Sequence, residues 1–462
     1  MVQVKGLSLT YPGQEKSLER IDFQLAAGEC LLLAGESGCG KSSILRSLNG
    51  LARHYDRASL SGDISLAGQS VKGMEVYQIA EWIASVFQNP KTHFFNVDTT
   101  LELVFYLENK GIARQQIQDR LEEMLALFPI RHLLDRDIFC LSGGEKQVLS
   151  LAAAYISGTP IIVLDEPSSN LDDRYTGVLA NMLQTLKARG VTLIIAEHRL
   201  HYLMPVVDRV CLIEDGRLVE TYYAEAFIGL SEEDRQARGL RSPVDTPLKR
   251  LQRPQLTGDL TVKKLQRQFK GTGTGFAIQG LGLDRACVYG IIGHNGAGKS
   301  TFLRILLGLE GGRGDIVYFK GKRVSKRQRL ALASLVMQDV NHQLFTETVD
   351  KEVSLGLKNI DRVEQGRILD RLGLARLADR HPMSLSGGEK QRVAIASALL
   401  SDRPIIAFDE PTSGMDWHHM VDLCHLIKAV AQQGKIVLVI SHDKEFLNRT
   451  ADRLINMEDY AL

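Results

Sequence analysis

The chain has 462 residues, of which 44% are hydrophobic and 24% charged, and its 56 basic residues almost balance its 55 acidic ones. This length and composition predict roughly two to four domains of a soluble globular protein. The chain has no basic tail that would indicate binding to nucleic acid or anionic lipid. It also has no run of about 18 apolar residues that would indicate direct insertion into a bilayer. The six cysteines form no CxxC pair, which argues against zinc and iron–sulfur sites.

The first half of the chain has the pattern of an α/β fold. A β-rich start leads through the apolar run 30–34 into a glycine-rich loop, and a helical pattern follows over 41–51. Residues 114–128 and 145–157 are also predicted to be helices. The apolar runs that end at 164 and at 196 suit parallel strands that are buried on both faces.

The second half repeats the first. The heptapeptide LSGGEKQ occurs at 141–147 and again at 385–391, and IIVLDEP at 161–167 returns as IIAFDEP at 405–411. A period this long indicates a duplicated domain rather than a solenoid. The stretch 231–259 is rich in charge and proline and is predicted to be a linker. We therefore expect a first domain at 1–230, this linker, and a second domain at 260–462.

Each copy contains the pattern GxxxxGK[ST], as GESGCGKS at 35–42 and GHNGAGKS at 293–300. Such a loop turns its backbone N–H groups toward phosphate oxygens, and the next helix adds the positive end of its dipole. The lysine reaches the β- and γ-phosphates and the serine binds Mg²⁺. The candidate nucleotide-binding residues of the two loops are Gly35, Gly38, Gly40, Lys41, Ser42, Ser43, Gly293, Asn295, Gly296, Gly298, Lys299, Ser300 and Thr301.

Two acidic pairs follow buried strands. Asp165 and Asp409 end apolar runs and suit the carboxylate that completes a P-loop Mg²⁺ site. Glu166 and Glu410 come next, where a carboxylate beside the γ-phosphate would orient and deprotonate an attacking water.

Taken together, the P-loop, LSGGEKQ, the acidic pair and a downstream histidine resemble the nucleotide-binding domains of ABC ATPases over nearly the whole chain. The resemblance implies two tandem P-loop NTPase domains, each with a RecA-like core, an antiparallel β subdomain and a helical subdomain. It also implies ATP hydrolysis with ATP and Mg²⁺. The residues that it adds to the site are the adenine-stacking aromatics Tyr11 and Phe269, the Mg²⁺- and water-sensing Gln88 and Gln338, the signature residues Ser142, Gly143, Gly144, Ser386, Gly387 and Gly388, and the switch histidines His198 and His442.

In this family the signature of one domain closes over the γ-phosphate that the other domain holds. The resemblance therefore implies an intramolecular head-to-tail pseudo-dimer. One site would join Lys41, Asp165 and Glu166 to Ser386 and Gly388. The other would join Lys299, Asp409 and Glu410 to Ser142 and Gly144. Because both glutamates, both histidines and both signatures are intact, we expect two hydrolysis-competent sites.

The segments after Gln88 and Gln338 resemble those of energy-coupling factor ATPases, which energise uptake of vitamins or transition metals. The second copy fits from Gln343 onward but has Val340 in place of proline, and the first departs at His93 and Phe94. This resemblance implies an integral membrane T component that docks through coupling helices, and with it a substrate-binding S component. It also implies a translocase that is bound peripherally at the cytoplasmic face of a prokaryotic cell membrane. No nucleic-acid partner is expected.

Three alternatives remain open. One is the tandem ATPase of a sugar-type ABC importer, which commonly has one degraded half. Another is a soluble tandem ABC protein that acts on ribosomes or DNA, usually with a long basic linker or inserted metal-binding cysteines. A third is a regulatory nucleotide-binding module without turnover, against which both intact glutamates argue. The transported solute cannot be read from this chain.

Overall fold

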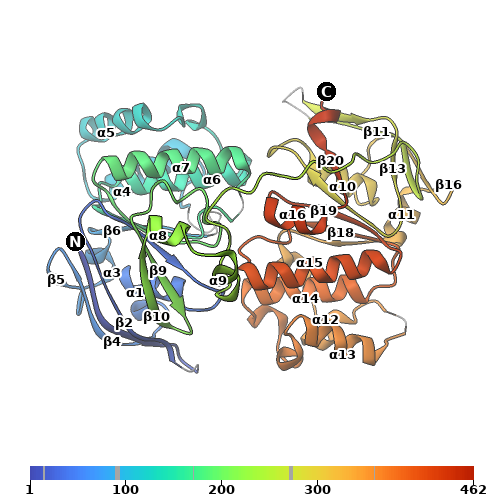
Figure 1. Ribbon diagram of the computed structural model, residues 1–462. Coiled ribbons are helices and arrows are strands. Elements are labelled where there is room, and N and C mark those ends of the chain that lie inside the picture. The colour runs from blue at the N-terminus through green and yellow to red at the C-terminus, as the bar shows by residue number, and fades with distance from the viewer. Residues whose placement is uncertain (14–15, 89–93, 170, 270–273, 358) are drawn as a thin grey trace. The chain divides into compact units, whose positions relative to one another are not determined.

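The computed structural model describes residues 1–13, 16–88, 94–169, 171–269, 274–357 and 359–462 (Figure 1). Contacts divide the chain into two units, Met1–Asp245 with Asp416–His418 and Thr246–Met415 with His419–Leu462. This division falls inside the predicted linker, whose residues Gln252 and Gln255 pair with Arg453 and Gly282 of the second unit. The boundaries 230 and 260 stay a prediction.

The core of the first unit is a six-stranded sheet in the order β10-β9-β3-β8-β7-β6. Neighbouring strands are parallel except β10, which is antiparallel to β9. Leu32 packs into one apolar cluster, and Leu31 and Leu33 pack into another, so the central strand is buried on both faces. The strands are β3 (Cys30–Ala34), β6 (Ile83–Val86), β7 (Ile161–Asp165), β8 (Thr192–Ala196), β9 (Arg209–Glu214) and β10 (Arg217–Tyr223).

A separate antiparallel sheet of the first unit has the order β2-β1-β4-β5. Alternate residues of β1, such as Val2 and Val4, are buried, which is the pattern of a half-buried strand. The strands are β1 (Val2–Thr10), β2 (Lys16–Leu25), β4 (Ser59–Leu66) and β5 (Gln69–Ser70).

The helices of the first unit include a subdomain in which α4, α5 and α6 contact one another. Phe128, at the end of α5, is 1% exposed and packs edge-to-face on Tyr155 of α6, with ring centroids 5.3 Å apart. The helices are α1 (Lys41–Leu48), α2 (Leu51–His54), α3 (Val76–Ile79), α4 (Thr99–Asn109), α5 (Arg114–Leu127), α6 (Gly143–Ile156), α7 (Asp173–Ala188), α8 (Ala224–Ile228) and α9 (Glu232–Ala237).

The second unit repeats this plan. Its parallel sheet has the order β17-β18-β19-β14-β20, and its other sheet is antiparallel, in the order β12-β11-β15-β16 with β13 also on β11. The strands are β11 (Leu260–Gln268), β12 (Gly275–Ile278), β13 (Leu281–Leu283), β14 (Cys287–Ile292), β15 (Arg313–Phe319), β16 (Lys322–Arg323), β17 (Ala333–Val336), β18 (Ile405–Asp409), β19 (Ile436–Ile440) and β20 (Arg453–Asn456). The helices are α10 (Lys299–Leu306), α11 (Lys326–Leu332), α12 (Val349–Val353), α13 (Arg362–Arg371), α14 (Gly387–Leu400), α15 (Trp417–Gln432) and α16 (Lys444–Thr450).

The predicted fold class is confirmed, because each unit has a parallel core, an antiparallel β subdomain and a helical subdomain. Two boundaries differ. The helical pattern predicted over 41–51 is interrupted, because α1 ends at Leu48 and α2 begins at Leu51. The helix predicted from residue 145 begins at Gly143, because Ser142 caps it through a reciprocal capping box with Glu145.

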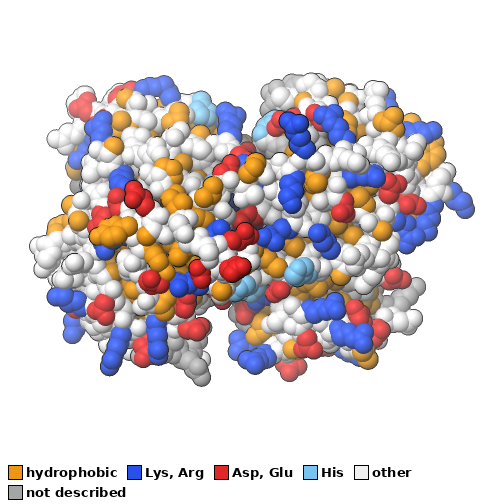
Figure 2. All heavy atoms as spheres, viewed as in Figure 1, with side chains coloured by type: hydrophobic (Ala, Val, Ile, Leu, Met, Phe, Trp, Pro, Cys, Tyr) orange, Lys and Arg blue, Asp and Glu red, His pale blue; other side chains and the backbone are white. Residues whose placement is uncertain are grey.

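The surface mixes both signs of charge. Figure 2 shows Lys and Arg interspersed with Asp and Glu on the visible face of each unit, as the nearly neutral balance of the sequence predicts. Within the described residues, no helix combines the length and apolar character that crossing a membrane requires.

Candidate functional site

The phosphate loop of the first unit connects β3 to α1. Gly35, Gly38 and Gly40 have φ values of 147°, 83° and 109°, which side chains rarely allow, so glycine is needed to turn the backbone here. Lys41 is buried, and its Nζ donates to the carbonyl oxygens of Gly35, at 2.9 Å, and Glu36, at 2.7 Å. The loop thus holds a lysine charge beside a curled backbone at a helix N-terminus, which is the geometry of an anion site.

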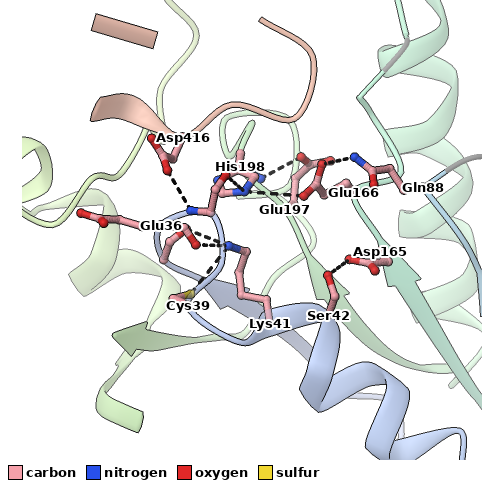
Figure 3. A network of polar contacts seen from close by, with 12 residues as sticks. Glu36, Cys39, Lys41, Ser42, Gln88, Asp165, Glu166, Glu197, His198 and Asp416 are labelled. Atoms are coloured by element: carbon pink, nitrogen blue, oxygen red, sulfur yellow. Dashed lines mark hydrogen bonds and ion pairs between the residues drawn. The ribbon is translucent and has the colours of Figure 1, made fainter. Parts of the chain in front are cut away.

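Ser42 and Asp165 meet although they are far apart in sequence. The Ser42 Oγ donates to Asp165 Oδ1 at 2.9 Å (Figure 3). The end of β7 brings the aspartate to the first turn of α1, and burial raises the pKa of its carboxyl group. One hydroxyl and one carboxylate oxygen are hard ligands of the kind that Mg²⁺ uses.

Glu166 turns away from its strand because its backbone is left-handed, with φ 43°. Such a conformation costs a non-glycine residue about 1–2 kcal/mol and is typical of functional sites. Its Oε2 accepts from Gln88 Nε2 at 2.7 Å, and its Oε1 lies 3.6 Å from His198 Nε2 (Figure 3). Burial first, and then the nearby carboxylate of Glu197, raise the pKa of Glu166 to about 8.

The second unit builds the same arrangement. Lys299 Nζ donates to the carbonyl oxygen of Gly293 at 2.8 Å, and Ser300 Oγ donates to Asp409 Oδ1 at 3.2 Å. Burial raises the pKa of Asp409. Glu410 is also left-handed, with φ 50°, and its Oε1 lies 3.5 Å from His442 Nε2. The structure therefore brings the predicted P-loop, acidic and histidine residues together in both units.

The two predicted adenine-stacking residues lie next to their own P-loops. Tyr11 Oη donates to Ser43 Oγ at 3.2 Å. A methyl group built on Gly298 would be 3.3 Å from Phe269 Cζ, so this ring lies against the second loop. The spacing of 24 residues before each loop thus identified an aromatic neighbour in both units.

Both signatures form helix N-termini. Ser142 and Ser386 are the N-caps of α6 and α14, each with a capping box to the glutamate three residues on. A methyl group on Gly144 would be 2.6 Å from the ring of Tyr175, whereas the nearest atom at Gly388 would be 3.7 Å away, on Arg392. The glycine in the first unit thus lets a tyrosine ring cover the start of the helix.

Some predicted features stay untested. Residues 89–93, which include His93 of the segment after Gln88, lie outside the described residues. The pairing of each P-loop with the signature of the other half, and the individual roles of the site residues, stay predictions.

The residues present fit Mg²⁺ bound with a nucleotide. Among the described residues, no group of three or more His, Cys, Asp or Glu could hold a metal ion by itself. Mg²⁺ in nucleotide sites is usually held by one or two protein oxygens together with phosphate and water. Each serine–aspartate pair supplies that set, and the lysine beside it supplies positive charge for the phosphates.

The sequence motifs do not include Glu197, which is 3% exposed and directly precedes His198. It accepts hydrogen bonds from Ser168 and from the backbone N–H of His198. A signal was present in the sequence, because AEHR in the first copy has an acidic residue where ISHD in the second has serine.

A parallel sheet with a phosphate loop at its carboxyl edge, a serine–aspartate pair and a following glutamate defines a P-loop ATPase. The chain belongs to the ABC transporter family, whose model ABC_tran matches residues 18–169 and 280–413. It is therefore an ATPase that binds ATP with Mg²⁺, with two ABC domains, as predicted.

Relatives and solved structures match nearly the whole chain. A protein of Treponema denticola, provisionally named an ABC transporter ATP-binding protein, is 37% identical over 98% of this chain and 95% of its own length. The archaeal ribosome recycling factor aABCE1, solved in complex with ribosomal stalk protein aP1, is 23% identical with a TM-score of 0.64, over 95% of this chain and 84% of that one. ABCE1 in a model of the ribosome-bound archaeal Pelota complex gives 23% and 0.69, over 97% and 76%. At this identity the two structures show a shared tandem fold.

These neighbours correct the predicted branch. The prediction of an energy-coupling factor subunit is wrong. It relied on the segments after Gln88 and Gln338, whereas the solved structures that match almost the full chain are ribosome-associated tandem ABC proteins. The same finding contradicts the predicted partners, which were the membrane T and S components and no nucleic acid. It also contradicts the predicted location at the cytoplasmic face of the membrane. The predicted translocase activity and membrane association are likewise not supported.

Proposed function

We propose that this chain is a tandem ABC ATPase that couples ATP hydrolysis in its two units to work on the ribosome. The observation that carries the proposal is the likeness of its whole tandem fold, over 97% of the chain, to ribosome-bound ABCE1. The intact site geometry in both units supports turnover, rather than nucleotide binding alone.

In this proposal Lys41 and Lys299 hold the phosphates, and the neighbouring serines and aspartates hold Mg²⁺, which when bound neutralises phosphate charge. Glu166 and Glu410 orient the attacking water and accept its proton. The raised pKa of Glu166 supports this role, because a more basic carboxylate takes a proton more readily. His198 and His442 are placed beside these carboxylates to contact the γ-phosphate.

Sedimentation through a sucrose cushion tests the ribosomal partner. The chain with Glu166→Gln and Glu410→Gln should bind ATP without hydrolysing it and pellet with ribosomal particles. ADP in place of ATP should release it. A chain with Lys41→Ala and Lys299→Ala is the matched control, because it keeps both glutamates but loses phosphate binding, and it should stay in the supernatant. Absence of the ATP-trapped chain from the ribosomal pellet at low and moderate salt would contradict the proposal.

A second candidate is an ATP-binding subunit of an ABC transporter of unspecified kind. The name of the 37% identical relative favours it. Fractionation of a cell lysate discriminates the two candidates. A transporter subunit should sediment with the membrane fraction whether ribosomes are intact or dissociated.

A further inference from the structure

Glu197 is the centre of a buried hydrogen-bond cluster in the first unit. Its Oε2 accepts from the backbone N–H of Ser168 at 3.1 Å, from the Ser168 hydroxyl at 2.7 Å and from Tyr202 Oη at 3.0 Å. Its Oε1 accepts from the backbone N–H groups of His198, at 2.8 Å, and Arg199, at 3.2 Å. One carboxylate thus joins Ser168, in the segment after β7, to the segment that carries the switch histidine. Figure 3 shows Glu197 beside His198.

The second unit lacks all three side chains of this cluster. At the corresponding positions, 244 residues later, it has Thr412, Ser441 and Phe446. The Thr412 and Ser441 hydroxyl oxygens lie 3.3 Å apart, and Phe446 has no hydroxyl group. All three partners therefore differ together, as expected if they work as one unit.

The backbone of the switch histidine has a different acceptor in each unit. The N–H of His442 donates to Oε2 of Glu410, at 3.3 Å, so the predicted base also holds this segment. The N–H of His198 donates to Glu197, and the corresponding Oε2 of Glu166 accepts from Gln88 instead. The first unit therefore assigns to two carboxylates what Glu410 does in the second.

We propose that Glu197 is a positioning residue of the first ATP site, which with Ser168 and Tyr202 fixes the His198 segment and leaves Glu166 to Gln88 and the attacking water. Hydrogen bonds to a charged acceptor are stronger than neutral ones, and a buried carboxylate needs several of them. The segment is consequently held before nucleotide binds. The two ATP sites of the chain are non-equivalent, and this inference rests on ATP hydrolysis alone, not on the ribosomal partner.

Hydrogen exchange and turnover of the full chain test the proposal. In Glu197→Gln, peptides that contain the amides of His198 and Arg199 should exchange about tenfold faster without nucleotide, as expected when a hydrogen bond to a charged acceptor is lost. Exchange over β3 and β8 should not change. Turnover should fall by about twofold or more while KM for ATP is unchanged, because the P-loop is untouched and only one of two sites is impaired.

A triple variant guards against misfolding. Ser168→Thr with Glu197→Ser and Tyr202→Phe installs the side chains that already pack in the second unit. It should fold, show the same faster exchange over 198–199, and lower turnover without changing KM.

The control for a purely structural effect is Asp208→Ala. This side chain accepts hydrogen bonds from the N–H of Cys30 and from Lys187 Nζ. Cys30 begins β3, at the end of the strand opposite to the P-loop. Asp208→Ala should accelerate exchange over the whole sheet while turnover per folded molecule is unchanged. Three results for Glu197→Gln would each overturn the proposal. They are unchanged exchange over 198–199, unchanged turnover, and a turnover loss that merely follows faster exchange over the whole unit.

Discussion

Replacing Gly35 by alanine should destabilise the first unit far more than the same change at Gly293 destabilises the second. Both glycines open a phosphate loop, and their φ values of 147° and 142° are almost the same, so the backbone strain of about 1–3 kcal/mol is shared. The surroundings differ. A Cβ on Gly35 would lie 2.2 Å from the carbonyl oxygen of Ile213, whereas on Gly293 the nearest atom would be Ala297 Cβ at 3.2 Å.

The obstacle at Gly35 is backbone of β9, which is paired with β3, so it cannot rotate away as a side chain could. Forcing an extra carbon into such a site typically costs about 1–3 kcal/mol. The expected loss in free energy of unfolding is therefore about 2–6 kcal/mol for Gly35→Ala and about 1–3 kcal/mol for Gly293→Ala. The difference corresponds to a factor of roughly 5 to 150 in the unfolding equilibrium.

Native-state hydrogen exchange followed by mass spectrometry measures this, with β3 reporting the first unit and β14 the second. Each unit is its own reference in the same molecule, which avoids the assumption of two-state unfolding of the whole chain. Gly38→Ala is a further control, because its φ is 83° but no atom lies within 4 Å of the added carbon. Equal destabilisation by Gly35→Ala and Gly293→Ala would refute the reasoning.

Three other predictions follow. Glu166→Gln and Glu410→Gln should each lower ATP turnover in a coupled-enzyme assay, because both units have an intact site, and full activity of either variant would contradict this. Phe128→Ala should lower the free energy of unfolding of the first unit by about 3–5 kcal/mol in native-state hydrogen exchange, because the ring is fully buried; a loss below 1 kcal/mol would argue against its packing role. Asp361→Ala should lower the stability of α13 by about 1 kcal/mol, since the Asp361 carboxylate caps this helix through the N–H groups at 363 and 364. Faster hydrogen exchange confined to α13 would verify this prediction.

Local patterns predicted much of the fold. The apolar runs became β3, β7 and β8, and the helical pattern over 114–128 became α5, because burial on both faces and a 3.6-residue period are properties of the sequence itself. The start of α6 was predicted two residues late, because a capping serine lets two glycines, which are poor helix formers, enter the first turn.

The motifs also predicted which residues meet. Lys41 and Ser42 are adjacent in sequence, and His198 lies 32 residues after Glu166, as His442 does after Glu410. The 32-residue separation is set by the helix and the parallel strand that lie between the glutamate and the histidine, so the motif spacing already encodes their geometry. The partner does not follow from such spacing, and the assignment to an importer was accordingly wrong.

The sequence by itself determined that this chain has two ABC ATPase domains, because a P-loop, a signature and an acidic strand end recur in the same order in each half. Only the tertiary structure decided how each site is held. The left-handed backbone of Glu166 depends on its N–H bond to Ala196 of β8, and the role of Glu197 depends on the 29 residues that separate it from Ser168 being folded back between neighbouring strands. Hydrogen bonds across strands are long-range in sequence, so a local pattern cannot specify them.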